Sequence, residues 1–252
     1  MTDHILTEIR DRVLHITFNR PEKKNALTHA MYAKMVEAMR AAEEDSGVRA
    51  ILFAGAGDVF TSGNDLADFR DTPPLGPDAP VTQFLGCLLN AKKPLVMAVN
   101  GIAVGIGLTM LLHADIVYAS ENAVLQAPFV DLALVPEAAS SLLLPRLVGH
   151  AKAAEIFMLG KRVSADEAYT MGLVSQVFKA DELAEAAGKA ALALAKKAPQ
   201  SLQLTKKLMR GDHDAVAARM AEEGKLFGER LTSPELMEAI MAFMQKREPD
   251  FG

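Results

Sequence analysis

Short apolar runs divide the first half of the chain into predicted strands. Ile5–Ile9 and Val13–Phe18 flank the charged residues 10–12, which is the pattern of a β-hairpin. Further strands are predicted where largely apolar runs follow turn residues, at Ala50–Ala54, Leu95–Val99, Asp115–Ala119 and Ala123–Leu125.

Helical spacing begins after the hairpin and dominates the second half of the chain. Thr28 is a candidate N-cap for a helix to about Ala42, in which Met31, Met35 and Met39 recur every four residues. Other helices are predicted at Leu66–Asp71, Gln83–Asn90, Ala151–Leu159, Ala165–Met171, Asp181–Lys197, Ser201–Met209, His213–Phe227 and Pro234–Gln245. Strand–strand–helix order recurs three times before about residue 135. We therefore predict an α/β unit over 1–197 and a helical C-terminal region over 198–252.

Two segments need a separate interpretation. Leu95–Leu112 has 18 residues without a charge, long enough for a membrane span. Turn-forming Asn100-Gly101, followed by Gly105 and Gly107, favours a buried strand, a glycine-rich loop and a buried helix over Leu108–His113 instead. Residues 72–80 contain four prolines and one glycine and are predicted to form a mobile loop, whose closure over a ligand is left open.

Composition narrows the class of protein without identifying it. The 252 residues are 50% hydrophobic and 23% charged, which is typical of a globular chain and excludes wholesale disorder. The formal net charge of −5 gives no reason to expect a nucleic acid partner. Cys87 is the single cysteine, so an internal disulfide is excluded. The charged N-terminus does not resemble a signal peptide, and the cytoplasm is the expected compartment.

Familiar metal and nucleophile motifs are absent from the sequence. The six histidines have no ligand spacing, and neither a G-x-S-x-G elbow nor a phosphate-binding P-loop is found. We therefore predict no metal site.

Two glycine-centred loops are the first candidates for chemistry. Residues 60–66 and 100–109 each follow a predicted strand and open a predicted helix. At such junctions backbone N–H groups lack partners, and glycine lets a ligand approach the main chain. Side by side, the loops would hold one oxyanion between two N–H groups. The alternative is two tight turns with no ligand.

Glu137 is the second candidate. It is a lone carboxylate in the apolar stretch 132–141, and burial would raise its pKa and make it a proton acceptor. The alternative is a glutamate in the first turn of a helix opened by Pro136.

Together these segments resemble the crotonase, or enoyl-CoA hydratase/isomerase, superfamily from about Ile5 to Gln245. The strongest matches are Ser62-Gly63-Asn64-Asp65-Leu66, the run from Ala98 to Asp115, and Val135–Arg146. The resemblance implies a spiral of ββα repeats with a helical C-terminal region that covers the site or forms a trimer contact. It also implies an acyl-CoA thioester substrate, and homotrimers or dimers of trimers.

The resemblance also implies which residues act. The backbone N–H groups of Asn64 and Ile106 would form the oxyanion hole, and Gly63 and Gly105 would shape it together with Gly107. The positions of the two hydratase glutamates fall on Thr109 and Phe129, so hydratase activity is not expected.

The stretch 135–141 is similar to the Δ3,Δ2-enoyl-CoA isomerase branch, with Glu137 as its single catalytic base. Several members carry glycine where this chain has Ala138 and Ala139. Phe129 and Leu134 are expected to keep the pocket dry.

For the CoA part of the substrate, the resemblance implies the loop Ser62–Leu66 and the segment 23–27, including Lys24 and Ala26. Lys23, Lys24 or Arg20 would meet the phosphates, unless this is only a solvated basic loop.

No separate cofactor is expected. Alternatives are another acyl-CoA reaction, such as isomerisation of a ring-derived acyl-CoA or thioester hydrolysis, and a silent CoA-binding protein.

Overall fold

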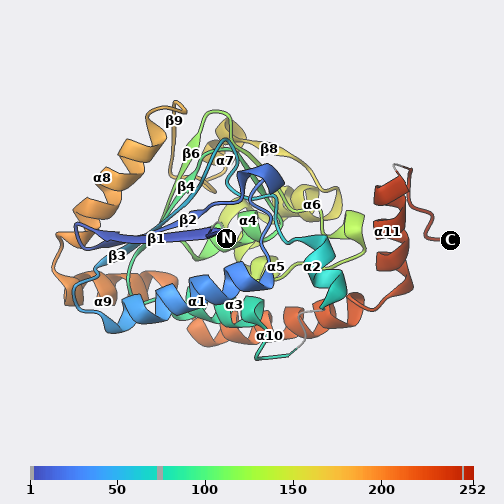
Figure 1. Cartoon of the computed structure of the whole chain (residues 1–252), viewed down its shortest axis with the longest axis horizontal. Coiled ribbons are helices and arrows are strands. Elements are labelled where there is room, and N and C mark those ends of the chain that lie inside the picture. The colour runs from blue at the N-terminus through green and yellow to red at the C-terminus, as the bar shows by residue number, and fades with distance from the viewer. Residues whose placement is uncertain (1–2, 73–75, 246) are drawn as a thin grey trace.

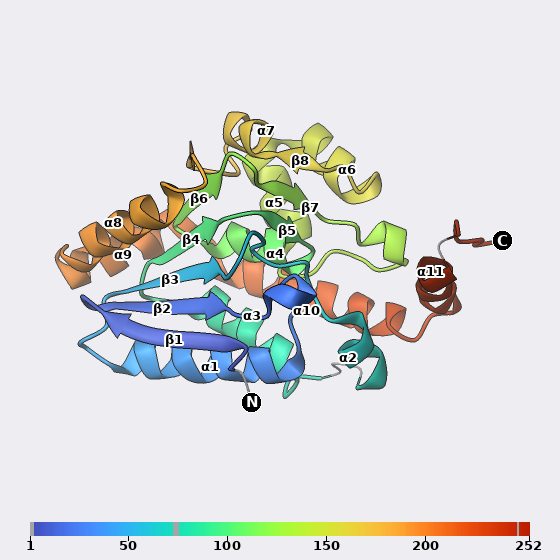
Figure 2. The same ribbon diagram turned by 45° about the horizontal axis from the view of Figure 1, so that its top comes forward.

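A computed structural model describes residues 3–72, 76–245 and 247–252, and it contains two sheets (Figures 1 and 2). The larger sheet has the order β1-β2-β3-β4-β6-β9, in which β1 is antiparallel to β2 and the other pairs are parallel. Its strands are β1 Ile5–Arg10, β2 Val13–Phe18, β3 Ala50–Gly55, β4 Leu95–Val99, β6 Ile116–Ser120 and β9 Gln176–Phe178. The smaller sheet contains β5 Ile102–Val104, β7 Val124–Gln126 and β8 Val163–Ser164, in that order.

In the first unit both strands, β1 and β2, belong to the larger sheet, whereas each later unit sends its first strand to the larger sheet and continues into the layer of the smaller one. β4 is followed by β5 and β6 by β7, and after β3 the chain reaches the same layer through a parallel bridge between Thr61 and Ala103. The predicted strand–strand–helix order is therefore confirmed. Strand β5 lies inside the segment predicted as a glycine-rich loop, and β8 and β9 were not predicted, because two or three residues are too few to show a periodicity.

Helices cover both faces of the larger sheet. The helices of the first half are α1 His29–Glu44, α2 Leu66–Asp71, α3 Pro80–Asn90 and α4 Ile106–Thr109, with short 3₁₀ helices η1 Pro21–Lys23, η2 Met110–His113 and η3 Val130–Leu132. Those of the second half are α5 Ser140–Val148, α6 His150–Met158, α7 Ala165–Thr170, α8 Leu183–Ala195, α9 Pro199–Arg210, α10 His213–Arg230 and α11 Pro234–Gln245. The predicted cap is confirmed, since the Thr28 side chain accepts a hydrogen bond from the Met31 N–H.

The two faces of the sheet form separate apolar clusters. Met31, Met35 and Met39 of α1 are buried in the main core with α3, while Ala187 and Ala191 of α8 pack on the opposite face of the sheet. Because α8 presents alanines, it lies close to the strands. The site described below lies on the α1 and α3 side, where α10 also passes (Figure 1).

Buried charges attach the C-terminal helices to the body. Lys206 of α9 donates to Asp115 Oδ2 at 2.7 Å and to the Lys93 carbonyl at 2.6 Å. Arg210 donates to the carbonyl of His113 at 2.6 Å. These contacts fix α9, and through it the start of α10, against the strand ends. Helix α11 lies at the edge of the molecule beside the C-terminus (Figures 1 and 2).

The uncharged segment Leu95–Leu112 is folded as β4, β5, α4 and the start of η2. No helix among the described residues is long and apolar enough to cross a membrane.

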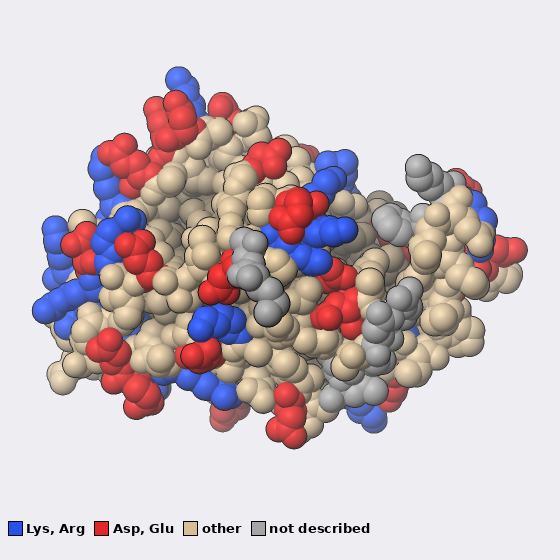
Figure 3. All heavy atoms as spheres, viewed as in Figure 1, with Lys and Arg blue, Asp and Glu red and all other residues tan. Residues whose placement is uncertain are grey.

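On the face drawn in Figure 3, acidic and basic side chains are interspersed. The loop predicted at 72–80 lies partly outside the described residues, and helix α3 begins at its last residue, Pro80.

Candidate active site

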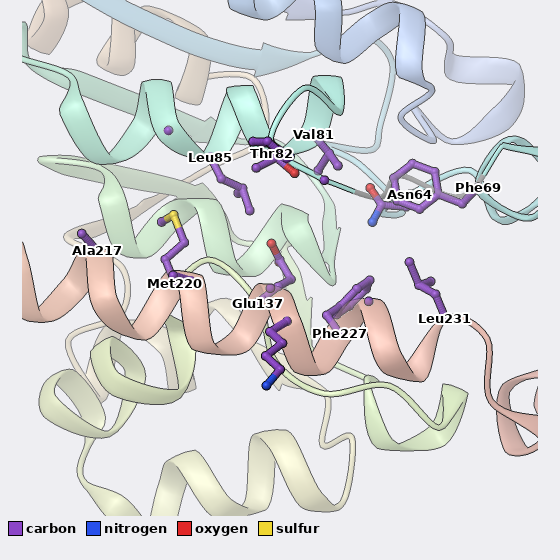
Figure 4. A pocket seen from close by; sticks show the side chains of 17 residues that line it. Asn64, Phe69, Val81, Thr82, Leu85, Glu137, Ala217, Met220, Phe227 and Leu231 are labelled. Carbon is purple, nitrogen blue, oxygen red and sulfur yellow. The ribbon is translucent and has the colours of Figure 1, made fainter.

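A cavity of about 700 Å³ lies between α3 and α10, and Glu137 and Asn64 both line it (Figure 4). Glu137 is between the two helices, and Asn64 and Phe69 are at one end. The lining is otherwise mostly apolar or small, with Val81, Thr82, Leu85 and Gly86 from α3 and Ala217, Met220, Ala221, Gly224, Lys225, Phe227 and Gly228 from α10, followed by Leu231. Gly76 and Pro77, from the predicted mobile loop, also line it.

The two glycine-centred loops lie side by side next to this cavity. The Val104 N–H donates to the Thr61 carbonyl at 3.0 Å, and the Thr61 N–H donates to the Ile102 carbonyl at 3.1 Å. Gly107 permits this approach, since a Cβ there would lie 2.7 Å from Cγ2 of Thr61. The two loops are therefore side by side, which is the arrangement that an oxyanion site between them requires.

Two N–H groups at this junction are available to a ligand. In the described part of the chain, no hydrogen bond from the backbone N–H of Asn64 or Ile106 to a protein acceptor is found. Their neighbours are engaged, since the Asp65 N–H donates to the Leu27 carbonyl and the Gly105 N–H donates to the Gln126 carbonyl. Ile106 is the first residue of α4, where an N–H has no intrahelical acceptor and the helix dipole favours negative charge.

Glu137 is a buried acid, with 8% of its surface exposed. Burial raises the pKa of its carboxyl group to about 7, a hydrogen bond from the Thr109 hydroxyl lowers it, and the charge of Glu223 raises it. A carboxyl with this pKa is a proton acceptor near neutral pH. Because Thr109 occupies one oxygen, the other is the one available to a substrate.

The backbone next to Glu137 is unusual. Ala138 and Ala139 have φ values of 62° and 56°, in the left-handed region where glycine is preferred. Helix α5 begins only at Ser140, so the alternative that places Glu137 in the first turn of a helix is wrong. Glu137 lies instead in a turn closed by a hydrogen bond from the Ser140 N–H to its carbonyl.

Other predicted residues lie around the cavity without lining it. Phe129 is buried against Phe157, with ring centroids 6.3 Å apart, and Leu134 is also buried. Neither belongs to the lining, so apolar side chains of α3 and α10 form the walls in their place. Gly105 and Ile106 form the loop beside the cavity.

The two segments predicted for the CoA part of the substrate lie together. The Ser62 N–H donates to the Lys24 carbonyl at 3.0 Å, and the Leu27 N–H donates to the Gly63 carbonyl at 2.9 Å. Arg20 donates to Asp65 Oδ2 at 2.7 Å and to the Ala26 carbonyl at 3.1 Å. Its guanidinium therefore braces the two segments, whereas Lys23 and Lys24 are both exposed.

Sequence reasoning missed the wall that α10 contributes. Its lining residues recur at spacings of three and four from Ala217 to Gly228, which is one face of a helix. That spacing is visible in the sequence but is equally typical of packing. Asn64 is also fixed by a residue that was not singled out, since the buried Tyr32 hydroxyl donates to its Oδ1 at 2.5 Å.

Among the described residues, no group of three or more His, Cys, Asp or Glu side chains is placed to hold a metal ion.

The whole arrangement matches a known family. The family model described as enoyl-CoA hydratase/isomerase matches residues 8–252. The chain belongs to this family. A crystal structure of an enoyl-CoA hydratase/isomerase from Pseudoalteromonas atlantica is 43% identical, with a TM-score of 0.96 over 99% of this chain and all of that one. The predicted crotonase fold is thus confirmed.

Curated family members of different activity are similar to this chain. Human enoyl-CoA delta isomerase 2 is 36% identical over 94% of this chain. The match covers 62% of the human protein, so this chain spans about three fifths of its length. The 1,2-epoxyphenylacetyl-CoA isomerase of Escherichia coli is 34% identical over all of this chain and 99% of the relative. The family description names both hydratases and isomerases, so membership of the family does not select one reaction. The choice between them has to rest on the residues of the site.

Proposed function

We propose that the protein is a Δ3,Δ2-enoyl-CoA isomerase, which moves the double bond of a 3-enoyl-CoA to the trans-2 position. One observation carries the proposal. Among the described residues that line the cavity, Glu137 is the single acid, and it faces an apolar space beside two available N–H groups. A 1,3-proton transfer needs one base and a site for an oxyanion, and no water, metal or separate cofactor.

The reaction follows from this geometry. Glu137 takes a proton from C2 of the thioester, and the electron pair moves onto the carbonyl oxygen to give a dienolate. The N–H groups of Asn64 and Ile106 hold that oxygen, and each such donor contributes roughly 10²–10³ in rate. The protonated Glu137 then returns the proton to C4, which leaves the double bond between C2 and C3. The apolar walls keep water away from the dienolate.

Hydration is disfavoured by the same residues. Adding water across a double bond requires one group to activate the water and a second to deliver a proton. Thr109, at one of the two expected glutamate positions, instead donates its hydroxyl hydrogen to Glu137. Phe129, at the other position, is an apolar side chain outside the cavity lining.

A second candidate is isomerisation of a ring-derived acyl-CoA. The full-length similarity to the 1,2-epoxyphenylacetyl-CoA isomerase favours it, and the cavity volume of about 700 Å³ exceeds that of a six-membered ring. Thioester hydrolysis and silent CoA binding are the remaining alternatives.

Conversion of trans-3-hexenoyl-CoA tests the proposal. The purified protein is expected to form the conjugated 2-enoyl thioester, which is followed by absorbance, and to hydrate trans-2-hexenoyl-CoA far more slowly. Turnover of a ring-derived acyl-CoA, with none of the hexenoyl substrate, would move the assignment to the second candidate. Thioester binding without turnover of any of these substrates would instead indicate a silent member.

The pH profile provides a prediction for Thr109. Since the pKa of Glu137 is about 7, kcat/KM for 3-hexenoyl-CoA should fall about tenfold per pH unit below that value. Thr109→Val removes a hydrogen bond that favours the ionised carboxylate, so the pKa of Glu137 rises. The acid limb of the pH profile, which is the fall of kcat/KM at low pH, then moves to higher pH. Rates measured well above both midpoints serve as the control, because both proteins are then ionised. A limb that does not move would contradict this role of Thr109.

The proposal includes a homotrimer or a dimer of trimers. The support is an apolar face on α9, where Leu204, Leu208 and Met209 are 61%, 81% and 79% exposed. Side chains of this size are seldom left in water together unless a partner covers them.

A further inference from the structure

A second buried glutamate, which the reaction does not use, lies close to Glu137. Glu223 of α10 is 4% exposed, although it is 86 positions away from Glu137 in the sequence. Its Oε1 accepts a hydrogen bond from the Ser141 N–H at 2.9 Å, while its Oε2 is buried and has no hydrogen-bond partner among the described residues. A buried carboxylate is costly, and one with an unpaired oxygen is more so. Apolar packing therefore does not explain its presence.

The contact that Glu223 makes is a helix cap supplied from another helix. Helix α5 begins at Ser140, and the preceding Ala139 has no side-chain oxygen to accept a hydrogen bond from the first turn. Glu223 accepts it instead, with its negative charge at the positive end of α5. Arg219, one turn earlier in α10, donates to Oγ of Ser141 at 3.1 Å and completes the contact.

This cap holds the turn that carries the proposed base. Ala138 and Ala139, the two left-handed residues, lie between Glu137 and α5, and such a turn persists only when its surroundings fix it. His113 holds one side through a hydrogen bond of 2.7 Å between its Nε2 and the Ala138 carbonyl. Glu223 holds the other side. If that contact is lost, the alanines can relax to ordinary φ values, and Glu137 then turns away from the cavity.

We propose that Glu223 is a positioning residue for Glu137: by capping α5 it fixes the strained turn that aims the base into the cavity. The inference rests on the proposed function, because it takes Glu137 as the base. Helix α10 then has two roles: it lines the cavity, and through Glu223 it holds the turn that carries Glu137.

The charge of Glu223 supplies a signature that a purely structural residue lacks. Glu137 faces Thr109 from α4, Tyr32 from α1 and Glu223 from α10, and Glu223 in turn faces Arg219. The negative charge of Glu223 raises the pKa of Glu137, so its removal should move the acid limb of the reaction to lower pH.

Two substitutions separate the cap from the charge. Glu223→Gln keeps an oxygen that accepts from Ser141 and removes the charge, so it should keep kcat within a few-fold at high pH and shift the acid limb downward. Glu223→Ala removes both. It should lower kcat for 3-hexenoyl-CoA on the order of 100-fold, as a misplacement of about 1 Å does, with little change in KM. The matched control is Glu229→Gln, an exposed carboxylate on the same helix that lies outside the cavity lining and does not pair with Arg219 in the described structure, and which should leave both quantities unchanged.

Hydrogen exchange tests the cap without any substrate. The amide of Ser141 should exchange roughly tenfold to 100-fold faster in Glu223→Ala than in wild type, and at the wild-type rate in Glu229→Gln. This result would stand even if no enoyl-CoA were turned over, so the two proposals can fail separately. Glu223→Ala with wild-type kcat and exchange would overturn the inference. So would a Glu223→Gln variant that is as impaired as Glu223→Ala.

Discussion

Glu137→Gln is expected to lower kcat for 3-hexenoyl-CoA by about 10²–10⁴, the range that a positioned base contributes. The amide has the same shape, and its oxygen can still accept the hydrogen bond from Thr109, so the cavity should survive. What is lost is the group that takes the proton from C2 and returns it to C4. Steady-state kinetics above pH 8, where the wild-type carboxylate is ionised, measure the loss without interference from protonation.

The same substitution should stabilise the protein at high pH. Burial raises the pKa of Glu137 from 4.5 to about 7, so the folded protein binds this proton more tightly than the unfolded chain. The resulting stability is fully present below pH 4.5 and is lost as the pH rises through 7, a change of about 3 kcal/mol. Glu137→Gln avoids this loss and should unfold at higher urea than wild type at pH 8, with the gap closing near pH 5.

Together, kcat and the urea midpoint show whether Glu137→Gln has lost the catalytic base or has lost stability. A Gln variant that is stable, binds the thioester and is inactive supports Glu137 as the base. Activity close to that of wild type would remove Glu137 from the mechanism. A variant that is less stable than wild type at pH 8 would contradict the account of a buried charge, whatever its activity.

Much of the fold was predictable because local patterns determined it. The strands β2 and β4 were predicted with the bounds that the structure shows, since each is a compact apolar run between turn residues. Helix α2 was also predicted at Leu66–Asp71, and there Asp65 caps the first turn by accepting from the Ala67 and Asp68 N–H groups. The two loops were predictable because a glycine between a strand and a helix marks a tight turn that other residues adopt less readily.

The remainder depends on contacts between distant segments. Nothing near Glu137 in the sequence indicates that Glu223 caps the next helix. The sequence of α10 also does not reveal whether its apolar face lines a cavity or packs against other helices. The short strand β8 forms because Val163 and Ser164 pair with β7, about 40 residues away. Phe129 was expected in the pocket on the basis of position, but its ring packs on Phe157, which the local sequence does not reveal.

Gly63→Ala is expected to lower kcat by about 10²–10³, the contribution of one oxyanion donor. Gly63 precedes Asn64 and has a φ of 94°, and a Cβ on it would lie 2.9 Å from the Val104 carbonyl oxygen. That oxygen belongs to the second loop, so the added methyl group pushes the two loops apart at the point where their N–H groups must converge. Because the strain is local and Glu137 lies on a different segment, the acid limb of the pH profile should stay near pH 7 while its plateau falls.

Gly149→Ala is the matched control for backbone strain. Gly149 has a similar positive φ of 82°, but a Cβ there meets no atom of the described residues within 4 Å, and the residue joins α5 to α6 outside the cavity lining. Both substitutions impose a positive φ on an alanine, at a cost of roughly 1–3 kcal/mol, and should lower the urea midpoint. Only Gly63→Ala should lose the rate. Equal kinetic losses in the two variants would mean that general destabilisation, and not the spacing of the Asn64 and Ile106 N–H groups, limits the reaction.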